Sequence, residues 1–142
     1  MLMVIHLYLF WGTWQDVKKR KVSNTYLWLG TATSLIYRGM EILKVKSSLK
    51  EWLAAMIPGI LMLIIAKSTK EKIGYGDGWL LLILGNVLNI IDIWYVLQIA
   101  VLLVTLFSII LIIGKKVCRD DQIPFLPFLW MGYIIWRGLQ YG

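Results

Sequence analysis

The sequence predicts an all-α integral membrane protein, a bundle of six transmembrane helices forming a single membrane-embedded domain over residues 1–142. Hydrophobic residues make up 59% of the 142 residues, well above the roughly 45–50% of a soluble globular protein. They also come in long runs, because neither residues 52–66 nor residues 99–113 contain a charged side chain. Apolar runs of this length are typical of membrane-spanning helices.

The first predicted helix begins at the N-terminus. Residues 1–15 are apolar and aromatic, and the basic run of residues 18–21 follows them. A secretory signal peptide has the reverse charge order, so we interpret the segment as a retained helix with its N-terminus outside. Fifteen residues span only about 22 Å of a hydrocarbon core of about 30 Å. We therefore expect the helix to continue past Asp16 and to place this carboxylate at or just inside the membrane boundary.

The second and third helices follow the basic run. Asn24 is a suitable cap for a second helix over about residues 25–42. In that helix Arg38 and Glu41 have the spacing of an ion pair, which we expect near the outer interface. The third helix covers about residues 49–66, and Pro58-Gly59 in its middle predicts a kink.

Three more helices complete the bundle. The fourth, over about residues 77–90, has small or polar packing positions at Gly85, Asn86 and Asn89. Asp92 is expected in a tight outer turn before a fifth helix over about residues 93–113. The sixth helix opens with residues 123–128 and ends near residue 140, since proline is tolerated at a helix start.

The distribution of basic residues predicts the orientation. Of the 15 Lys and Arg residues, ten fall in loops on one side, and the other five are Arg38, Lys44, Lys46, Lys50 and Arg137. The positive-inside rule places the side with ten in the cytoplasm, so both chain ends are expected outside. Basic loops beside anionic lipid headgroups account for the net charge of +7. Membrane lipids are therefore expected partners, and nucleic acid is not.

Two aspartates stand apart from the other acidic residues. Asp16 and Asp77 each adjoin the apolar part of a predicted helix, and the predicted topology puts both at the cytoplasmic end. Two carboxylates that face each other cannot both ionise cheaply, so one keeps its proton while the other is charged. Such a pair can activate a water and protonate a leaving amine, as in aspartic proteases. Asp16 and Asp77 are thus the candidate catalytic pair.

Asp77 belongs to the stretch Gly74-Tyr75-Gly76-Asp77, where a basic loop meets an apolar helix. The glycines allow a tight turn or a close approach between chain segments. A purely structural alternative is that Asp77 caps the helix, since free N–H groups and the helix dipole favour a carboxylate there. Other chemistries have less support, because His6 is the one histidine and Cys118 the one cysteine. We expect neither a nucleophile–histidine pair, nor a metal site, nor a cofactor.

Three stretches together resemble the type IV prepilin peptidases, a family of GxGD membrane aspartyl peptidases. Residues 16–24, Asp-Val-Lys-Lys-Arg-Lys-Val-Ser-Asn, resemble the family's first aspartate motif, an Asp followed by a basic turn and Ile-Pro-Asn. Residues 74–77 are similar to its GxGD motif, and residues 123–128, Ile-Pro-Phe-Leu-Pro-Phe, to its Pro-Phe-x-Pro-Phe stretch. The chain departs from the pattern at Ser23, usually Pro, and at Trp79, frequently Lys.

The resemblance implies a peptidase of the prokaryotic plasma membrane, multi-pass and with its active site facing the cytoplasm. It would cut the basic leader from prepilin-like precursors such as type IV pilins, pseudopilins or archaeal flagellin-like proteins. The implied catalytic residues are Asp16 and Asp77. The implied supporting motif residues are Gly74, Gly76, Arg20, Asn24, Pro124, Phe125 and Pro127. With one cysteine, the chain resembles the short relatives that lack the zinc-binding insert associated with N-methylation.

Two other functions remain open from the sequence. A catalytically silent membrane component of a pilus or secretion assembly would use both aspartates as caps. A small ion-coupled or proton-coupled transporter would use them as its ion site. Cleavage of a precursor by the purified protein separates the peptidase from both, because a transporter acts only across a sealed membrane.

Overall fold

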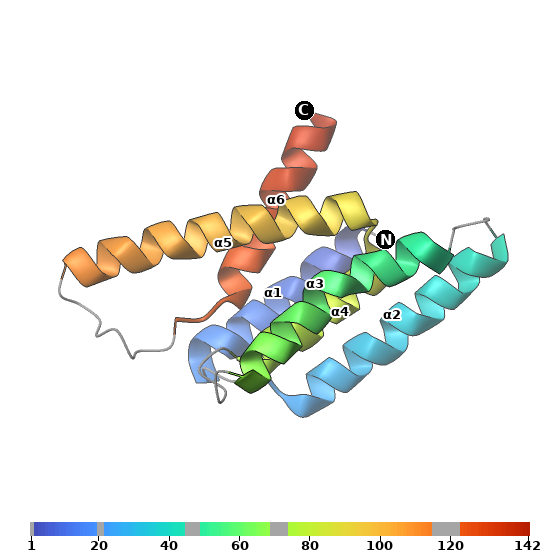
Figure 1. The fold of residues 1–142 in the computed structure, drawn as a ribbon, viewed down its shortest axis with the longest axis horizontal. Coiled ribbons are helices and arrows are strands. Elements are labelled where there is room, and N and C mark those ends of the chain that lie inside the picture. Colours follow the sequence, from blue (N-terminus) through green and yellow to red (C-terminus); the bar gives the residue numbers. More distant parts are fainter. Residues whose placement is uncertain (1, 20–21, 45–48, 69–73, 115–122) are drawn as a thin grey trace. The chain divides into compact units, whose positions relative to one another are not determined.

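The described part of the computed structural model contains six α-helices and no strand (Figure 1). It comprises residues 2–19, 22–44, 49–68, 74–114 and 123–142. The helices are α1 (Leu2–Lys19), α2 (Asn24–Lys44), α3 (Leu49–Ser68), α4 (Tyr75–Val87), α5 (Ile90–Ile113) and α6 (Leu126–Tyr141). The all-α prediction with six helices is therefore confirmed.

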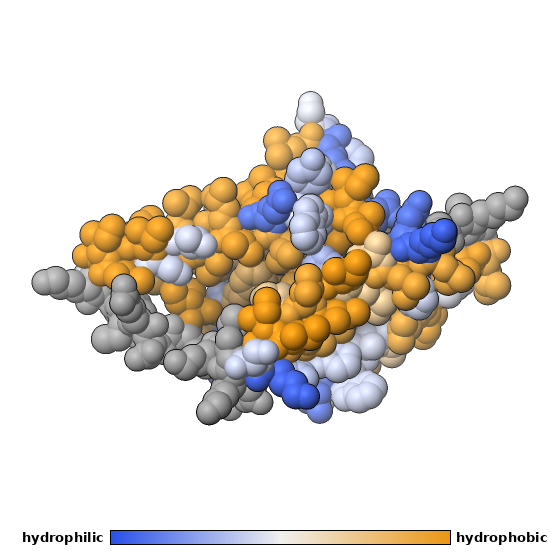
Figure 2. All heavy atoms as spheres, in the orientation of Figure 1, coloured by the Kyte–Doolittle hydropathy of each residue, from blue (hydrophilic) through white to orange (hydrophobic). Residues whose placement is uncertain are grey.

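Two of the helices, α3 and α5, are long and apolar enough to cross a membrane by themselves, judged on the described residues. The six-span topology and the outer position of both chain ends stay predictions. Hydrophobic residues cover most of the face in view in Figure 2. Large exposed apolar side chains occur on all six helices; examples are Leu7, Trp28, Ile64, Tyr75, Ile110 and Leu139. Contiguous exposed apolar surface is rare on soluble monomers, and it suits a protein whose helices face lipid.

Several helix boundaries differ from the sequence predictions by up to three residues, and two of the differences affect residues named above. α1 does continue past Asp16, to Lys19. However, α2 begins at Asn24 itself, and the Ser23 carbonyl accepts the N–H of Leu27 at 3.2 Å, so Ser23 and not Asn24 occupies the capping position. Asp92 lies in the first turn of α5 and is buried, so it is not part of the turn before that helix. Both errors are shifts of one to three residues, the range within which helix ends are hardest to predict.

The chain forms two compact units. The first, called here the terminal unit, contains Met1–Arg20 and Tyr95–Gly142. The second, the central unit, contains Lys21–Trp94. The boundary falls inside α5, and each unit is described by itself.

In the central unit, α4 packs against α3 through small residues. A Cβ atom on Gly59 would lie 2.7 Å from the backbone N of Leu82, and one on Gly78 would lie 2.7 Å from the Leu63 side chain. A Cβ on Gly85 would overlap the backbone carbonyl of Ala55. Residue numbers rise along α3 as they fall along α4, so the two helices are antiparallel. Close contact through small residues is a common way for helices to associate in membranes.

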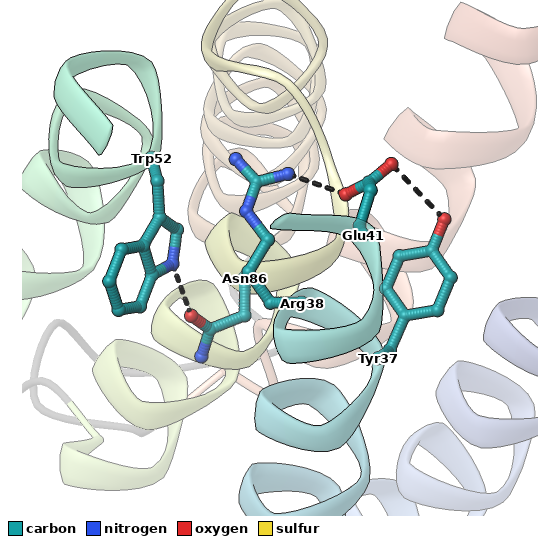
Figure 3. A network of polar contacts seen from close by, with 5 residues as sticks. All are labelled: Tyr37, Arg38, Glu41, Trp52 and Asn86. Carbon is teal, nitrogen blue, oxygen red and sulfur yellow. Dashed lines mark hydrogen bonds and ion pairs between the residues drawn. The ribbon is translucent and has the colours of Figure 1, made fainter. Parts of the chain in front are cut away.

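A network of polar side chains joins α2, α3 and α4 within the central unit, and Figure 3 shows its contact between Trp52 and Asn86. The indole N–H of Trp52 donates to Asn86 Oδ1 at 2.7 Å, and the amide nitrogen of Asn86 donates to Ser34 Oγ at 3.4 Å. Asn86 and Ser34 are both buried. Since these three residues come from three helices, their hydrogen bonds fix the rotation of each helix relative to the others.

The predicted ion pair on α2 is present beside this network. Arg38 Nη1 donates to Glu41 Oε2 at 2.7 Å, and the Tyr37 hydroxyl contacts Glu41 Oε1 at 3.4 Å. Asn89, expected to pack, is exposed and instead accepts the N–H of Ile93 through its carbonyl at 3.0 Å. Pro58 lies inside α3, and the kink expected there stays a prediction.

In the terminal unit, α1 packs against α6. The buried residues there include Leu9 of α1 and Leu126, Leu129 and Tyr133 of α6, all with no exposed surface. Gly132 allows α6 to approach the backbone of α5, because a Cβ there would lie 2.8 Å from the carbonyl oxygen of Val96. The terminal unit thus brings the end of α1 together with the beginning of α6.

Candidate active site

Asp16 lies in the last turn of α1 and is only 6% exposed. Its Oδ2 accepts a hydrogen bond of 3.2 Å from the backbone N–H of Leu126. Leu126 is the first residue of α6 and has no exposed surface. This bond joins positions 110 residues apart in the chain. A carboxylate so buried is oriented by the donor that it contacts.

The Pro124–Phe128 stretch explains why the Leu126 N–H is available. The first N–H groups of any helix lack a partner inside that helix. Phe125 is the N-cap residue of α6, and its carbonyl already accepts the N–H groups of Phe128 and Leu129, each at 3.1 Å. Pro127, the second helical residue, has no N–H. Leu126 therefore supplies the free donor of this turn, at the positive end of the helix dipole.

Pro124, Phe125 and Pro127 are predicted motif residues, but the sequence does not predict that their turn contacts Asp16. Phe125 is 9% exposed, and Pro124 is partly buried. One signal could have indicated the contact. The predicted topology starts the sixth helix on the same side of the membrane as Asp16, and a helix N-terminus is a favourable partner for a carboxylate.

Asp77 is the third residue of α4 and is partly buried. Its backbone N–H donates to the Gly74 carbonyl at 3.1 Å, and Gly74 is the N-cap residue. The prediction that Asp77 falls in the first turn is therefore confirmed. The alternative that Asp77 itself is the N-cap residue does not hold, because that position is occupied by Gly74, which has no side chain. A carboxylate at the third position is still favoured by the free N–H groups and the dipole.

Gly74 is required for the space that it leaves beside Asp77, and not for an unusual backbone conformation. Its φ of −59° and ψ of 122° are accessible to any L-residue. A Cβ at this position would lie 3.0 Å from Asp77 Oδ2. The carboxylate of Asp77 thus folds back over the N-terminus of α4, and the absence of a side chain on Gly74 leaves room for it.

Gly76 faces the segment that carries the first motif. A Cβ on Gly76 would lie 3.6 Å from Cβ and Cγ2 of Val22, an ordinary van der Waals distance. Val22 is six residues after Asp16 and precedes Ser23 and α2. Within the central unit, Val22 of the first aspartate motif therefore lies against Gly76 of the Gly74–Asp77 motif.

The contact between α3 and α4 shows how far Asp77 lies from the C-terminal end of α3. Its neighbour Gly78 approaches Leu63, whereas α3 continues to Ser68. Five further residues correspond to roughly 7 Å of helix. Asp77 is therefore about one helical turn inside the end of α3, among apolar residues, and its neighbours Gly78 and Leu80 are buried.

The predicted site residues are divided between the two units. Asp16, Pro124, Phe125 and Pro127 belong to the terminal unit, while Asn24, Gly74, Gly76 and Asp77 belong to the central unit. Asn24, the first residue of α2, is exposed. Arg20 lies outside the described residues, as does Cys118. That Asp16 and Asp77 face each other as a catalytic pair stays a prediction, because they belong to different units.

One protein-family model matches the chain over residues 3–113, that of the type IV leader peptidase family. The matched range includes Asp16 and the Gly74–Asp77 motif and ends before the Pro124–Phe128 stretch. No curated protein and no solved structure matches the chain.

Proposed function

The chain belongs to the type IV leader peptidase family, and from this premise we propose that it is an aspartic-type endopeptidase that removes the basic leader of prepilin-like precursors. Family membership makes the protein a protease. The aspartic mechanism, the precursor class and the cytoplasmic boundary of the plasma membrane as the place of cleavage are the content of the proposal.

The observation that carries the proposal is the environment of Asp16. The side chain is buried at the end of α1, and one of its oxygens accepts the N–H of Leu126. A solvated surface aspartate is hydrogen-bonded by water and does not require a donor from a second helix. With Oδ2 engaged, Oδ1 is the oxygen that can contact a catalytic water. An oriented carboxylate in a largely dry setting is what water activation requires.

The proposed reaction uses both aspartates. The charged carboxylate takes a proton from water as the oxygen attacks the carbonyl carbon of the scissile bond. The protonated carboxyl group donates a hydrogen bond to the carbonyl oxygen, which becomes negative. When the tetrahedral intermediate collapses, the C–N bond breaks, and the leaving amine receives the proton that the first carboxylate took from water. The products are a leader with a carboxylate end and a precursor with a new amino terminus.

Two further observations support a shared role for Asp16 and Asp77. The connection between the motifs is short, since Val22 follows Asp16 by six residues and lies against Gly76. Six residues extend at most about 20 Å. In addition, Asp77 lies inside the end of α3 and Asp16 lies in the last turn of α1, so each is close to the end of an apolar helix.

The test is cleavage of a precursor by the purified protein in detergent. Asp16→Asn and Asp77→Asn are each expected to abolish cleavage while expression and thermal stability stay near those of the wild type. Asp121→Asn is the matched control and should cleave normally. Asp121 lies outside the described residues, and its place in the sequence after Lys115, Lys116 and Arg119 predicts a solvated loop charge. Cleavage retained by either Asn variant removes that aspartate from the mechanism. If the wild type cleaves no precursor, the silent-component or transporter function is favoured instead.

A further inference from the structure

Buried polar side-chain atoms without a hydrogen-bond partner in the described part of the chain include two at the contact between α1 and α6. They are Thr13 Oγ1 and Trp130 Nε1. The indole N–H is a donor only, whereas the hydroxyl both donates and accepts. Buried polar groups are nearly always hydrogen-bonded, and an unpaired one is destabilising. Two such groups on the same pair of helices indicate a site that is completed by another molecule.

Neighbouring contacts place both residues on the surfaces where α1 and α6 meet. Phe10, Thr13 and Asp16 are three residues apart and therefore share one face of α1. The Phe10 ring contacts the Trp130 ring with centroids 5.5 Å apart, and Asp16 contacts Leu126. Thr13 thus lies between two residues that touch α6. Trp130 follows Leu126 by one turn on the facing helix.

Both residues are about one helical turn, or ~5 Å, from Asp16 along the helices. They lie toward the beginning of α1, which in the predicted topology is the direction of the membrane interior. A precursor whose leader is in the cytoplasm and whose apolar segment is in the membrane would meet this position just after the scissile bond.

The chemistry of the substrate at that position matches the two groups. A peptide bond in a helix is shielded, so the precursor must unwind locally before cleavage. Its carbonyl groups then lose their helical partners where little water is present, which is unfavourable. A threonine hydroxyl and an indole N–H can both donate to such carbonyls. We propose that Thr13 and Trp130 bind main-chain carbonyl oxygens of the unwound precursor segment that directly follows the scissile bond.

This inference rests on the proposed function, and it makes a distinctive prediction about two variants. Thr13→Val and Trp130→Phe remove the donor and keep much of the side-chain volume. Each should lower kcat/KM roughly three- to tenfold, the effect of one lost hydrogen bond. Each should leave Tm unchanged or raise it, because the free protein loses a buried polar group that has no partner. Reduced cleavage without reduced stability is not expected from a purely structural residue.

Matched controls come from the same unit. Thr105→Val removes a hydroxyl that already donates to the Val101 carbonyl at 2.7 Å. Trp136→Phe changes another α6 indole, whose ring stacks on Tyr95 at 4.2 Å. Both should retain kcat/KM near that of the wild type.

A modified substrate tests the contact directly. Three precursor peptides are compared, and in each a thioamide, which is a weaker acceptor, replaces one of the first three peptide bonds after the cleaved bond. The wild type should cleave at least one of these peptides more slowly than the unmodified precursor. For that peptide, the thioamide should have no further effect in the variant that lacks the donor to the modified carbonyl, which is either Thr13→Val or Trp130→Phe.

The possible outcomes separate the inference from the proposed function. If the wild type cleaves and Asp16→Asn does not, but both donor variants cleave like the wild type, the carbonyl subsite is wrong. The same conclusion follows if the donor variants lose stability without losing kcat/KM, since a bridging water would then be the partner. If the thioamide effect is equal in wild type and variants, the groups do not contact those carbonyls. Failure of the wild type to cleave any precursor contradicts the proposed function itself.

Discussion

Replacing Leu126 by proline removes the N–H group that donates to Asp16 at 3.2 Å. Proline is well tolerated at the first position of a helix, because its missing N–H has no partner inside the helix. The change therefore affects the Asp16 carboxylate more than the helix. Hydrogen bonds to charged groups contribute about 1.5–3 kcal/mol, and the loss corresponds to a kcat/KM that is roughly 10- to 150-fold lower. We expect kcat to fall and KM to change little, since the carboxylate acts in the transition state.

Leu126→Ala is the matched control because it keeps the N–H. Leu126 has no exposed surface, so both variants lose side-chain packing, and truncation of a buried leucine costs about 2–5 kcal/mol in soluble proteins. Proline adds a small strain, since Phe125 has helical φ and ψ of −85° and −30°, values that are unfavourable before proline. Tm measured for both variants reports these losses separately from catalysis.

The assay is initial-rate cleavage of a precursor by purified protein in detergent, at a temperature at which both variants are folded. The expected result is a much lower kcat for Leu126→Pro than for Leu126→Ala. Equal kcat values in the two variants would show that the N–H does not orient Asp16, and the role assigned to the Pro124–Phe128 stretch would be wrong.

Three further predictions concern packing, the second motif and topology. Gly85→Ala should lower the free energy of unfolding by about 1–3 kcal/mol, because its Cβ overlaps the α3 backbone, whereas Gly39→Ala, with open space at its Cβ, should be neutral or stabilising in thermal unfolding. Gly74→Ala should reduce kcat by displacing the Asp77 carboxylate, 3.0 Å from the new Cβ; normal kcat would contradict this. Cys118 should react with an impermeant thiol reagent only from the cytoplasmic side. Labelling of intact cells from outside would contradict the predicted orientation.

The sequence by itself determined the helical class and the family. Long apolar runs separated by short polar segments gave six helices whose ends are correct within about three residues, because burial in lipid and local turn residues act over short stretches of chain. The Arg38–Glu41 ion pair was equally predictable, since residues three apart on a helix are neighbours. The aspartate motifs indicated the peptidase family because a catalytic group needs a specific residue at a specific position.

Only the tertiary structure decided which helix faces meet. The bond between Leu126 and Asp16, the approach of Gly85 to Ala55 and the contact of Trp52 with Asn86 each join different helices. The sequence gives little indication of such pairs, because helices that are apolar on every side carry no hydrophobic stripe to define an inward face. Their rotation and register are set by close packing of small residues and by a few buried hydrogen bonds, which depend on the position of both partners in space.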